Sequence, residues 1–75
     1  MSSYPDFSDE QLLDRLRQLA AFRYGELVEE QESGTWRVRF VKYAEPDEPG
    51  LVILSAEAPD LRHAREVLLL AAESS

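Results

Sequence analysis

Residues 36–40 alternate strictly between apolar and cationic side chains, and this pattern constrains the fold more than any other stretch of the chain. The run reads Trp-Arg-Val-Arg-Phe, with an apolar residue at every second position. Successive side chains of a β-strand point to opposite faces, so a period of two predicts a strand with one packed face and one wet face. Such a strand needs neighbours, and we expect the rest of the chain to supply a sheet and a covering layer.

A helix is predicted before this strand. Ser8 is placed to cap its free amides, and Gln11 stands three residues later, which is the spacing of a capping box. Leucines then recur at spacings of three and four, which gives the segment one apolar face. We expect the helix to run from about residue 8 to 23 and to end at Gly25.

Two further strands and a second helix are predicted around the central strand. Residues 26–31 read as a first strand crowded with glutamates, and residues 50–56 read as a third strand with apolar side chains on both faces. The connection between the last two strands, residues 44–50, is acidic and broken by prolines. Pro59 occupies a favoured first-turn position, and the last helix is expected to reach about Ala72.

The first two strands are predicted to form a hairpin with a three-residue loop, Glu32-Ser33-Gly34. This register places Val28 across from Val38. A two-residue loop would instead set Glu29 against Val38 and put a charge on the packed face, which burial disfavours. We therefore expect the longer loop.

These elements define an α+β fold. We expect a single small domain over residues 1–75, in the order α-β-β-β-α, with a three-stranded antiparallel sheet packed by two helices. Residues 1–6 and 74–75 read as loose ends. A chain of 75 residues is near the lower limit for folding without disulfides or metals, so it has little room for a deep active-site cleft.

The composition indicates an acidic, cytoplasmic protein. Eight basic and fifteen acidic residues give a formal charge of −7, and the cationic middle strand between acidic segments predicts charge neutralisation across neighbouring strands. The chain holds no cysteine, which removes disulfides and thiolate chemistry. We expect no secretion signal, because the first residues carry neither a basic segment nor an apolar run. The longest apolar stretch, residues 67–72, is too short to span a membrane.

The chain carries more apolar side chains than a single domain of this size is expected to bury. The last helix is apolar around more than half of its circumference. The second and third strands are predicted to carry Val41, Tyr43, Leu51 and Ile53 on the face opposite the packed one. Such a surplus is usually covered by another chain; ordinary scattered surface residues are the alternative. The predicted partner interface comprises Val41, Tyr43, Leu51, Ile53, Val67, Leu69 and Leu70.

No residue pattern predicts catalysis, a cofactor or a metal. His63 is the only histidine, and no nucleophile stands at a spacing that implies a catalytic triad. Glu45, Asp47 and Glu48 gather in the 44–50 connection, without the spacing, the central glycine or the terminal glutamate of an EF-hand loop. We expect no enzyme activity, no cofactor and no bound metal.

A basic cluster, Arg62-His63-Ala64-Arg65, opens the last helix. Together with the helix–three-strand–helix order and the Trp36–Phe40 strand, this cluster resembles the double-stranded RNA-binding domains. The resemblance implies contacts with RNA phosphates and the minor groove, made by Arg62, His63 and Arg65. The family's loop between the first two strands, with its Gly-Pro and His, has no counterpart here, and an acidic chain repels phosphate overall.

The sequence therefore favours a small non-enzymatic protein–protein interaction module, a regulatory or assembly subunit that forms a homodimer or binds another protein. The alternative is a nucleic-acid binder of the double-stranded RNA-binding type that uses the start of the last helix. A third hypothesis is an enzyme that builds its site between subunits, with His63 as the base.

Overall fold

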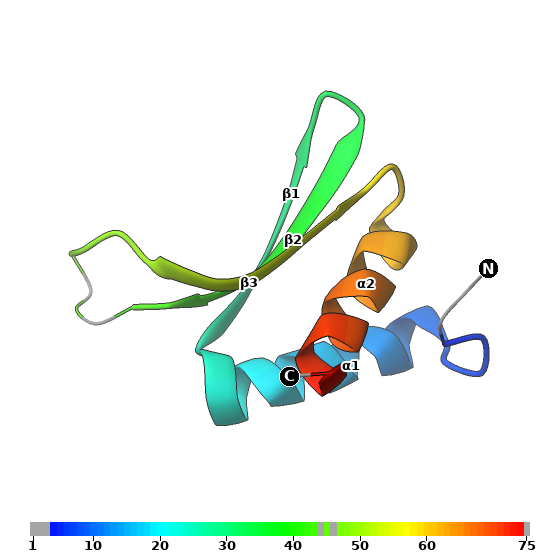
Figure 1. Cartoon of the computed structure of the whole chain (residues 1–75), viewed down its shortest axis with the longest axis horizontal. Helices are drawn as coiled ribbons and strands as arrows, with labels where there is room; N and C mark the ends of the chain where they lie inside the picture. The colour runs from blue at the N-terminus through cyan, green and yellow to red at the C-terminus, as the bar shows by residue number, and fades with distance from the viewer. Residues whose placement is uncertain (1–3, 44, 46, 75) are drawn as a thin grey trace.

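The computed structural model of this chain describes residues 4–43, 45 and 47–74. Its element order is helix, three strands, helix, which confirms the predicted α+β fold (Figure 1). The elements are α1 (Asp9–Leu19), a π-helical turn η1 (Ala20–Tyr24), β1 (Glu26–Glu32), β2 (Thr35–Lys42), β3 (Leu51–Ala58) and α2 (Leu61–Ser74).

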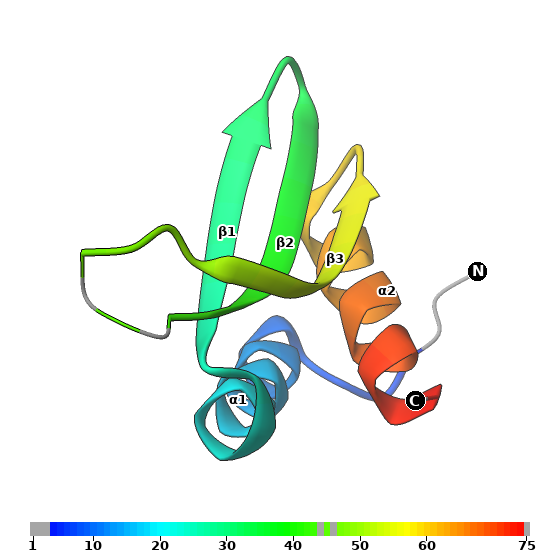
Figure 2. The same cartoon turned by 60° about the vertical axis from the view of Figure 1, so that its left-hand side comes forward.

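The molecule has two layers, a sheet and a pair of helices. The sheet is antiparallel with the strand order β1-β2-β3, and both helices lie on one of its faces (Figures 1 and 2). Helix α2 packs against β3 and β2, whereas α1 packs against α2 and β1. The largest fully buried side chains lie between the layers: Phe40, Leu12, Leu16, Leu68, Leu69 and Val38. The period of two in residues 36–40 is confirmed, because Val38 and Phe40 belong to this core.

Helix α1 begins at the predicted capping box and continues into an unusually wide last turn. The Gln11 backbone N–H donates to Ser8 Oγ at 3.1 Å, and the Ser8 N–H donates to Gln11 Oε1 at 2.9 Å. At the other end the Gly25 N–H donates to the Ala20 carbonyl at 2.6 Å, which closes the π-helical turn. Gly25 has φ +110°, and a Cβ there would lie 2.5 Å from the Val41 carbonyl oxygen. Only glycine fits this junction between helix and sheet.

The β1–β2 hairpin has a two-residue turn, so the predicted three-residue loop is wrong. Ser33 and Gly34 both have positive φ, 53° and 79°, as a type I′ turn requires. This turn sets Glu29 across from Val38, so the glutamate side chain lies on the packed face of the sheet.

An arginine on the facing helix makes this register possible. The Arg65 guanidinium donates Nε–H to Glu29 Oε2 at 2.5 Å and Nη2–H to Glu29 Oε1 at 2.8 Å. This bidentate pair neutralises the carboxylate under the sheet. In the sequence Glu29 stands as an isolated charge, because the arginine that removes the cost of burying it lies 36 residues away.

Strand β3 contains a bulge that shifts its alternation of faces. Phe40 pairs with Leu54 and Val41 pairs with Val52, which leaves Ile53 without a partner in β2. Val52 therefore shares a face with Val41, and Leu51, which pairs with Lys42, lies on the other face. The prediction that Leu51 shares the face of Val41 is wrong, because it assumed an unbroken period of two.

The described part of the first loose segment is held by α2. Arg62 Nη2 donates to the Tyr4 carbonyl at 2.9 Å and to the Phe7 carbonyl at 2.6 Å. The Tyr4 hydroxyl donates to Glu73 Oε2 at 3.0 Å, and its ring packs beside the Phe7 ring with centroids 5.4 Å apart. The predicted loose ends are thus corrected for Tyr4, which these contacts hold, and for Ser74, which belongs to α2; residues 1–3 and 75 lie outside the described residues.

Helix α2 begins at Leu61, two residues after Pro59, which was predicted to lie in its first turn. The Asp60 carboxylate accepts the His63 N–H at 3.2 and 3.3 Å, so Asp60 caps the helix and Pro59 precedes the cap.

Candidate interaction surface

The folded chain leaves a set of large apolar side chains exposed. Five of the seven residues predicted for a partner interface belong to it, and it also includes Val52 and Phe22, which sequence reasoning missed. The exposed residues are Phe22, Tyr43, Leu51, Val52, Ile53, Val67 and Leu70. Val41 and Leu69 are buried in the single chain, at 5% and 0% exposure. This corrects the predicted interface, which loses both residues.

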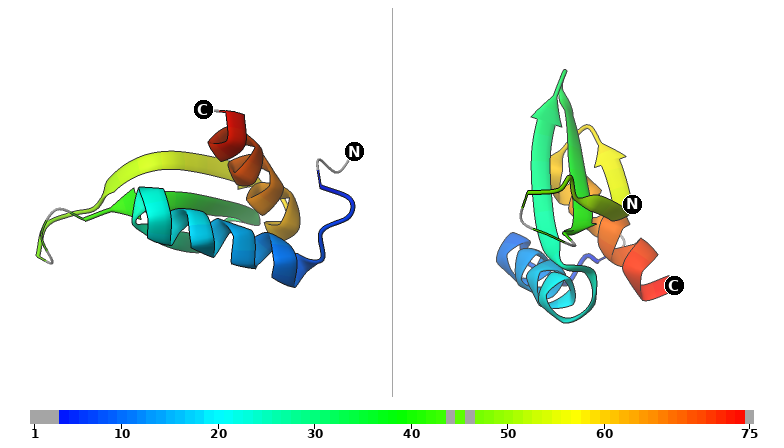
Figure 3. Two further views of the ribbon diagram at one scale, coloured as in Figure 1. Left: turned by 90° about the horizontal axis from the view of Figure 1, so that it is seen from below. Right: turned by 90° about the vertical axis from the view of Figure 1, so that its left-hand side faces the viewer.

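Four of these side chains belong to the outer part of the β2–β3 hairpin, which we call the arm (Tyr43 and Leu51–Ile53). The arm extends past the end of the helical layer (Figure 3), and Leu51 is 67% exposed there. A Cβ at Gly50 would meet Val41 Cγ1 and lie 2.7 Å from a Tyr43 ring carbon, so these two side chains cover Gly50 closely. The arm is an exposed apolar surface that the helical layer does not cover.

Helix α2 adds a second apolar group to the surface. Val67 and Leu70 are exposed, whereas Leu68 and Leu69 between them are fully buried. Residues 63, 67 and 70 follow the spacing of one helical face, and that face is turned away from the core. The predicted apolar excess of the last helix is therefore real, although Leu69 serves the core.

The two edges of the sheet differ in charge. β1 carries Glu26, Glu30 and Glu32 as exposed residues. β3 carries no charged residue from Leu51 to Ala56, and Glu57 is its only one. Within the described part of the chain, neither β1 nor β3 has a strand paired to its outer edge. Acidic side chains discourage pairing at such an edge, so the β3 edge is the better place for another strand to add.

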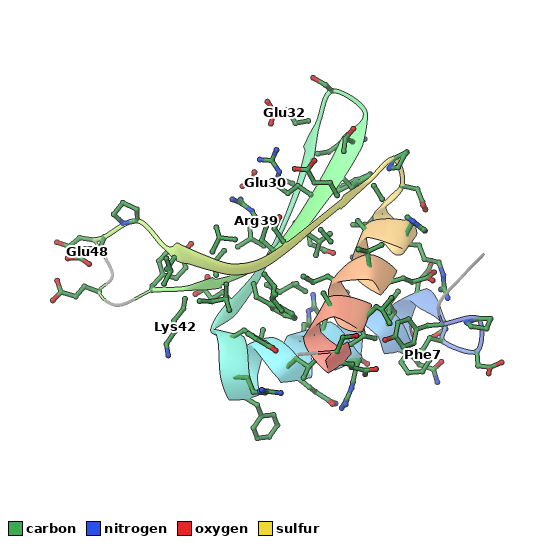
Figure 4. All side chains as sticks on the ribbon, in the orientation of Figure 1. Phe7, Glu30, Glu32, Arg39, Lys42 and Glu48 are labelled. Carbon is green, nitrogen blue, oxygen red and sulfur yellow. The ribbon has the colours of Figure 1, made fainter. Side chains whose placement is uncertain are left out.

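The sheet face opposite the helices carries cross-strand ion pairs, as predicted from the charge pattern. Arg37 Nε lies 2.7 Å from Glu57 Oε1, and Arg39 Nη2 lies 2.7 Å from Glu30 Oε1. The hydrogen bond to Glu57 raises the pKa of Arg37. Figure 4 shows Arg39 and Glu30 on the strands, away from both helices. These pairs neutralise the wet face and leave no concentrated positive charge on it.

A shallow hollow lies on this face near the turn of the first hairpin. Its lining comprises Glu30, Glu32, Ser33, Thr35, Arg37 and Glu57. Arg37 and Glu57 are bound to each other, and Glu30 is bound to Arg39. A group of surface carboxylates alone does not define a ligand site, and we assign none to the hollow.

The arginines implied as RNA contacts are engaged inside the chain. Arg62 binds Asp9 through Nη1 at 2.6 Å and Glu66 through Nε at 2.9 Å, in addition to its two backbone carbonyls. Both hydrogen bonds given above bind the Arg65 guanidinium to the Glu29 carboxylate. Hydrogen bonds to Asp9 and to Glu29 raise the pKa values of Arg62 and Arg65, respectively. Of the three predicted nucleic-acid contacts, only His63 is exposed.

The other candidate groups do not converge. Among the described residues, no three histidine, aspartate or glutamate side chains are placed to hold a metal ion. Glu45, Asp47 and Glu48 are exposed in the loop, while Ala44 and Pro46 lie outside the described residues. No helix in the described ranges is long and apolar enough to cross a membrane.

No family model, curated protein or solved structure matches this chain. Its function must therefore be argued from the surfaces described above.

Proposed function

We propose that this protein is a small, non-enzymatic protein–protein interaction module, a regulatory or assembly subunit that works in the cytoplasm. The exposed apolar set on the arm and on α2 is the observation that carries the proposal. A monomer of this size gains nothing by leaving Leu51, Val52 and Leu70 in water, and groups of exposed apolar side chains commonly mark a protein contact site.

Two further features support the proposal. Gly50, which precedes the arm's second segment, is closely packed by the side chains of Val41 and Tyr43. This packing holds the apolar residues of the arm in place before a partner binds, which lowers the entropic cost of binding. The absence of cysteine fits a reducing compartment, where a small chain must take its stability from packing and from partners.

The proposal is tested by removing the apolar surface without disturbing the fold. In a double variant, Leu51→Ser with Leu70→Ser, both changed side chains are exposed, so we expect unfolding free energy to stay within about 1 kcal/mol of the parent. Association with itself, or with a protein recovered from native extract, should fall at least tenfold.

Phe22→Ser is the matched control. Phe22 is 87% exposed on η1 and belongs to neither the arm nor α2. It should leave association unchanged. Equal association by the parent, the double variant and the control would contradict the proposed surface.

A further inference from the structure

We infer that a second copy of this chain covers β3, by pairing its own β3 edge to edge and antiparallel, so that two three-stranded sheets become one continuous sheet. This inference rests on the proposed function and deepens it by naming the partner. It begins from the backbone, because the outer edge of β3 has no strand paired to it among the described residues.

An edge strand is complementary to itself in one arrangement. Unpaired N–H and C=O groups along the edge match those of an identical strand that runs antiparallel about a twofold axis perpendicular to the sheet. In that arrangement one residue of β3 faces its own copy across the axis, and both helical layers lie on the same face of the joined sheet. The contact is closed, so it yields a dimer and no larger polymer.

The bulge limits where the axis can lie. Ile53 interrupts the ladder, so the regular part of β3 is Leu54–Ala58. The axis then passes near Ser55 or Ala56, close to the middle of the usable edge. In these two registers Glu57 faces Ile53 or Ser55 of the other copy, and no two like charges stand opposite each other.

Charge selects this edge over the other one. Each copy carries a formal charge of −7, so two copies meet most easily where neither presents acids. β3 is uncharged from Leu51 to Ala56, and its one acid, Glu57, is bound to Arg37. Pairing β1 with itself would instead bring Glu26, Glu30 and Glu32 of both copies together.

The same pairing accounts for the second apolar group. Helix α2 packs against β3 (Figure 2), so joining two β3 edges places the two α2 helices on the same face of the joined sheet, one on each side of the axis. Val67 and Leu70 then gain apolar neighbours from the other copy, and Ile53 and Val52 lie at the two ends of the joined strands. With the axis at Ser55, Val52 and Ile53 face Ala58 and Glu57 of the other copy, so one contact reaches residues of both exposed apolar groups.

Sedimentation of the full chain, measured from micromolar to millimolar concentration, tests the inference with a matched pair of variants. Ser55→Lys places a long charged side chain at an exposed position of the β3 edge; Gln31→Lys makes the same charge change at an exposed position of β1. We expect the parent to dimerise, Ser55→Lys to weaken the dimer at least tenfold, and Gln31→Lys to leave its dissociation constant within about threefold. Thermal unfolding of each variant at micromolar concentration checks that it is folded.

Either of two results overturns the inference. A parent that stays monomeric throughout shows that no second copy binds, while recovery of another protein by the intact apolar surface would still support the proposed function. Equal dimerisation by Ser55→Lys and the parent shows that the copies meet at another surface.

Cysteine cross-linking supplies an independent measurement, because the chain has no cysteine of its own. Opposed residues in an antiparallel pair are close enough for a disulfide. Ser55→Cys should give a disulfide-linked dimer under mild oxidation, at least tenfold faster than Gln31→Cys, and both positions are exposed. Faster linkage through Gln31→Cys would place the contact at β1 and overturn the inference.

Discussion

The two edge strands of this sheet are flanked in similar ways but are built differently. β1 follows Gly25, carries three exposed glutamates and is tied to α2 through Glu29 and Arg65. β3 follows Gly50, carries one charged residue and contains a bulge. Both strands pair with β2 on one side and have no described strand on the other. The difference between them lies in charge and anchoring, not in position.

This contrast shows how a small sheet can direct association. An edge that carries charges resists pairing, whereas an uncharged edge invites it. A chain with one edge of each kind can form a closed pair and cannot easily extend into a fibre, which would need both edges. The glutamates that made β1 a weak strand in the sequence therefore have a use: they restrict pairing to β3.

The largest expected effect comes from Gly25→Ala, at the start of β1. Its φ of +110° and the approach of the Val41 carbonyl oxygen leave no room for a side chain. We expect a loss of about 3 kcal/mol in the free energy of unfolding, measured in urea.

Gly50→Ala, at the start of β3, is the matched variant. There the new methyl would meet the side chains of Val41 and Tyr43, not backbone, and side chains can move aside. Gly50→Ala should lower the free energy of unfolding by less than half as much as Gly25→Ala. A Gly50→Ala loss as large as that of Gly25→Ala would show that the two junctions are equally rigid.

Glu29→Ala should have the second largest effect. It leaves the Arg65 guanidinium without its bidentate partner at a position where that side chain is 13% exposed. We expect a loss of about 2 kcal/mol on urea denaturation, and partial recovery when Arg65→Leu is added.

Glu30→Ala is the control for this pair, because Glu30 is exposed and forms a surface pair with Arg39. Its loss should stay below about 1 kcal/mol. An equal loss of unfolding free energy from Glu30→Ala and Glu29→Ala would show that the Glu29–Arg65 pair stabilises the fold no more than the surface pair does.

Neutralising β1 should change assembly and leave stability nearly as it is. A triple variant, Glu26→Thr, Glu30→Thr and Glu32→Thr, removes the three exposed acids from β1, and threonine suits a strand. We expect light scattering to show species larger than a dimer that grow with concentration. A triple variant that stays as small as the parent would show that charge is not what protects β1.

The smallest effect is expected from alkaline pH, which acts on the helical layer shared by both edges. Burial and then the hydrogen bond to Glu73 raise the pKa of Tyr4 above its ordinary 10.0. Above pH 10 the unfolded chain loses this proton first, so the unfolding free energy should decline as the pH rises past 10. Urea midpoints of Tyr4→Phe should decline less between pH 9 and 11, and an identical decline would remove Tyr4 as the cause.

Local patterns predicted the elements of this fold well. The Ser8 and Gln11 pair marked the start of α1, Gly25 marked the end of the helical segment, and the alternation in residues 36–40 identified β2 and its packed face. Each of these signals depends on neighbours within a few residues, which the sequence displays directly.

Features that depend on distant partners were not predictable in this way. Glu29 could be placed on the packed face only once Arg65 was known to lie opposite, and Arg62 looked like a free cation until its contacts with Asp9 and the Phe7 carbonyl were seen. The bulge at Ile53 has no local signature such as glycine, so the exposure of Val52 was missed. The π-helical turn likewise altered the helical phase around Phe22.

The hold that Arg62 has on residues 4–7 also bears on how the chain acquires its structure during synthesis. The Tyr4 and Phe7 carbonyls find their guanidinium partner only after more than fifty further residues have been made. Leu12 and Leu16 likewise belong to a core that is complete only after Leu68 and Leu69 have been made. A nascent chain therefore cannot complete its core until α2 has left the ribosome.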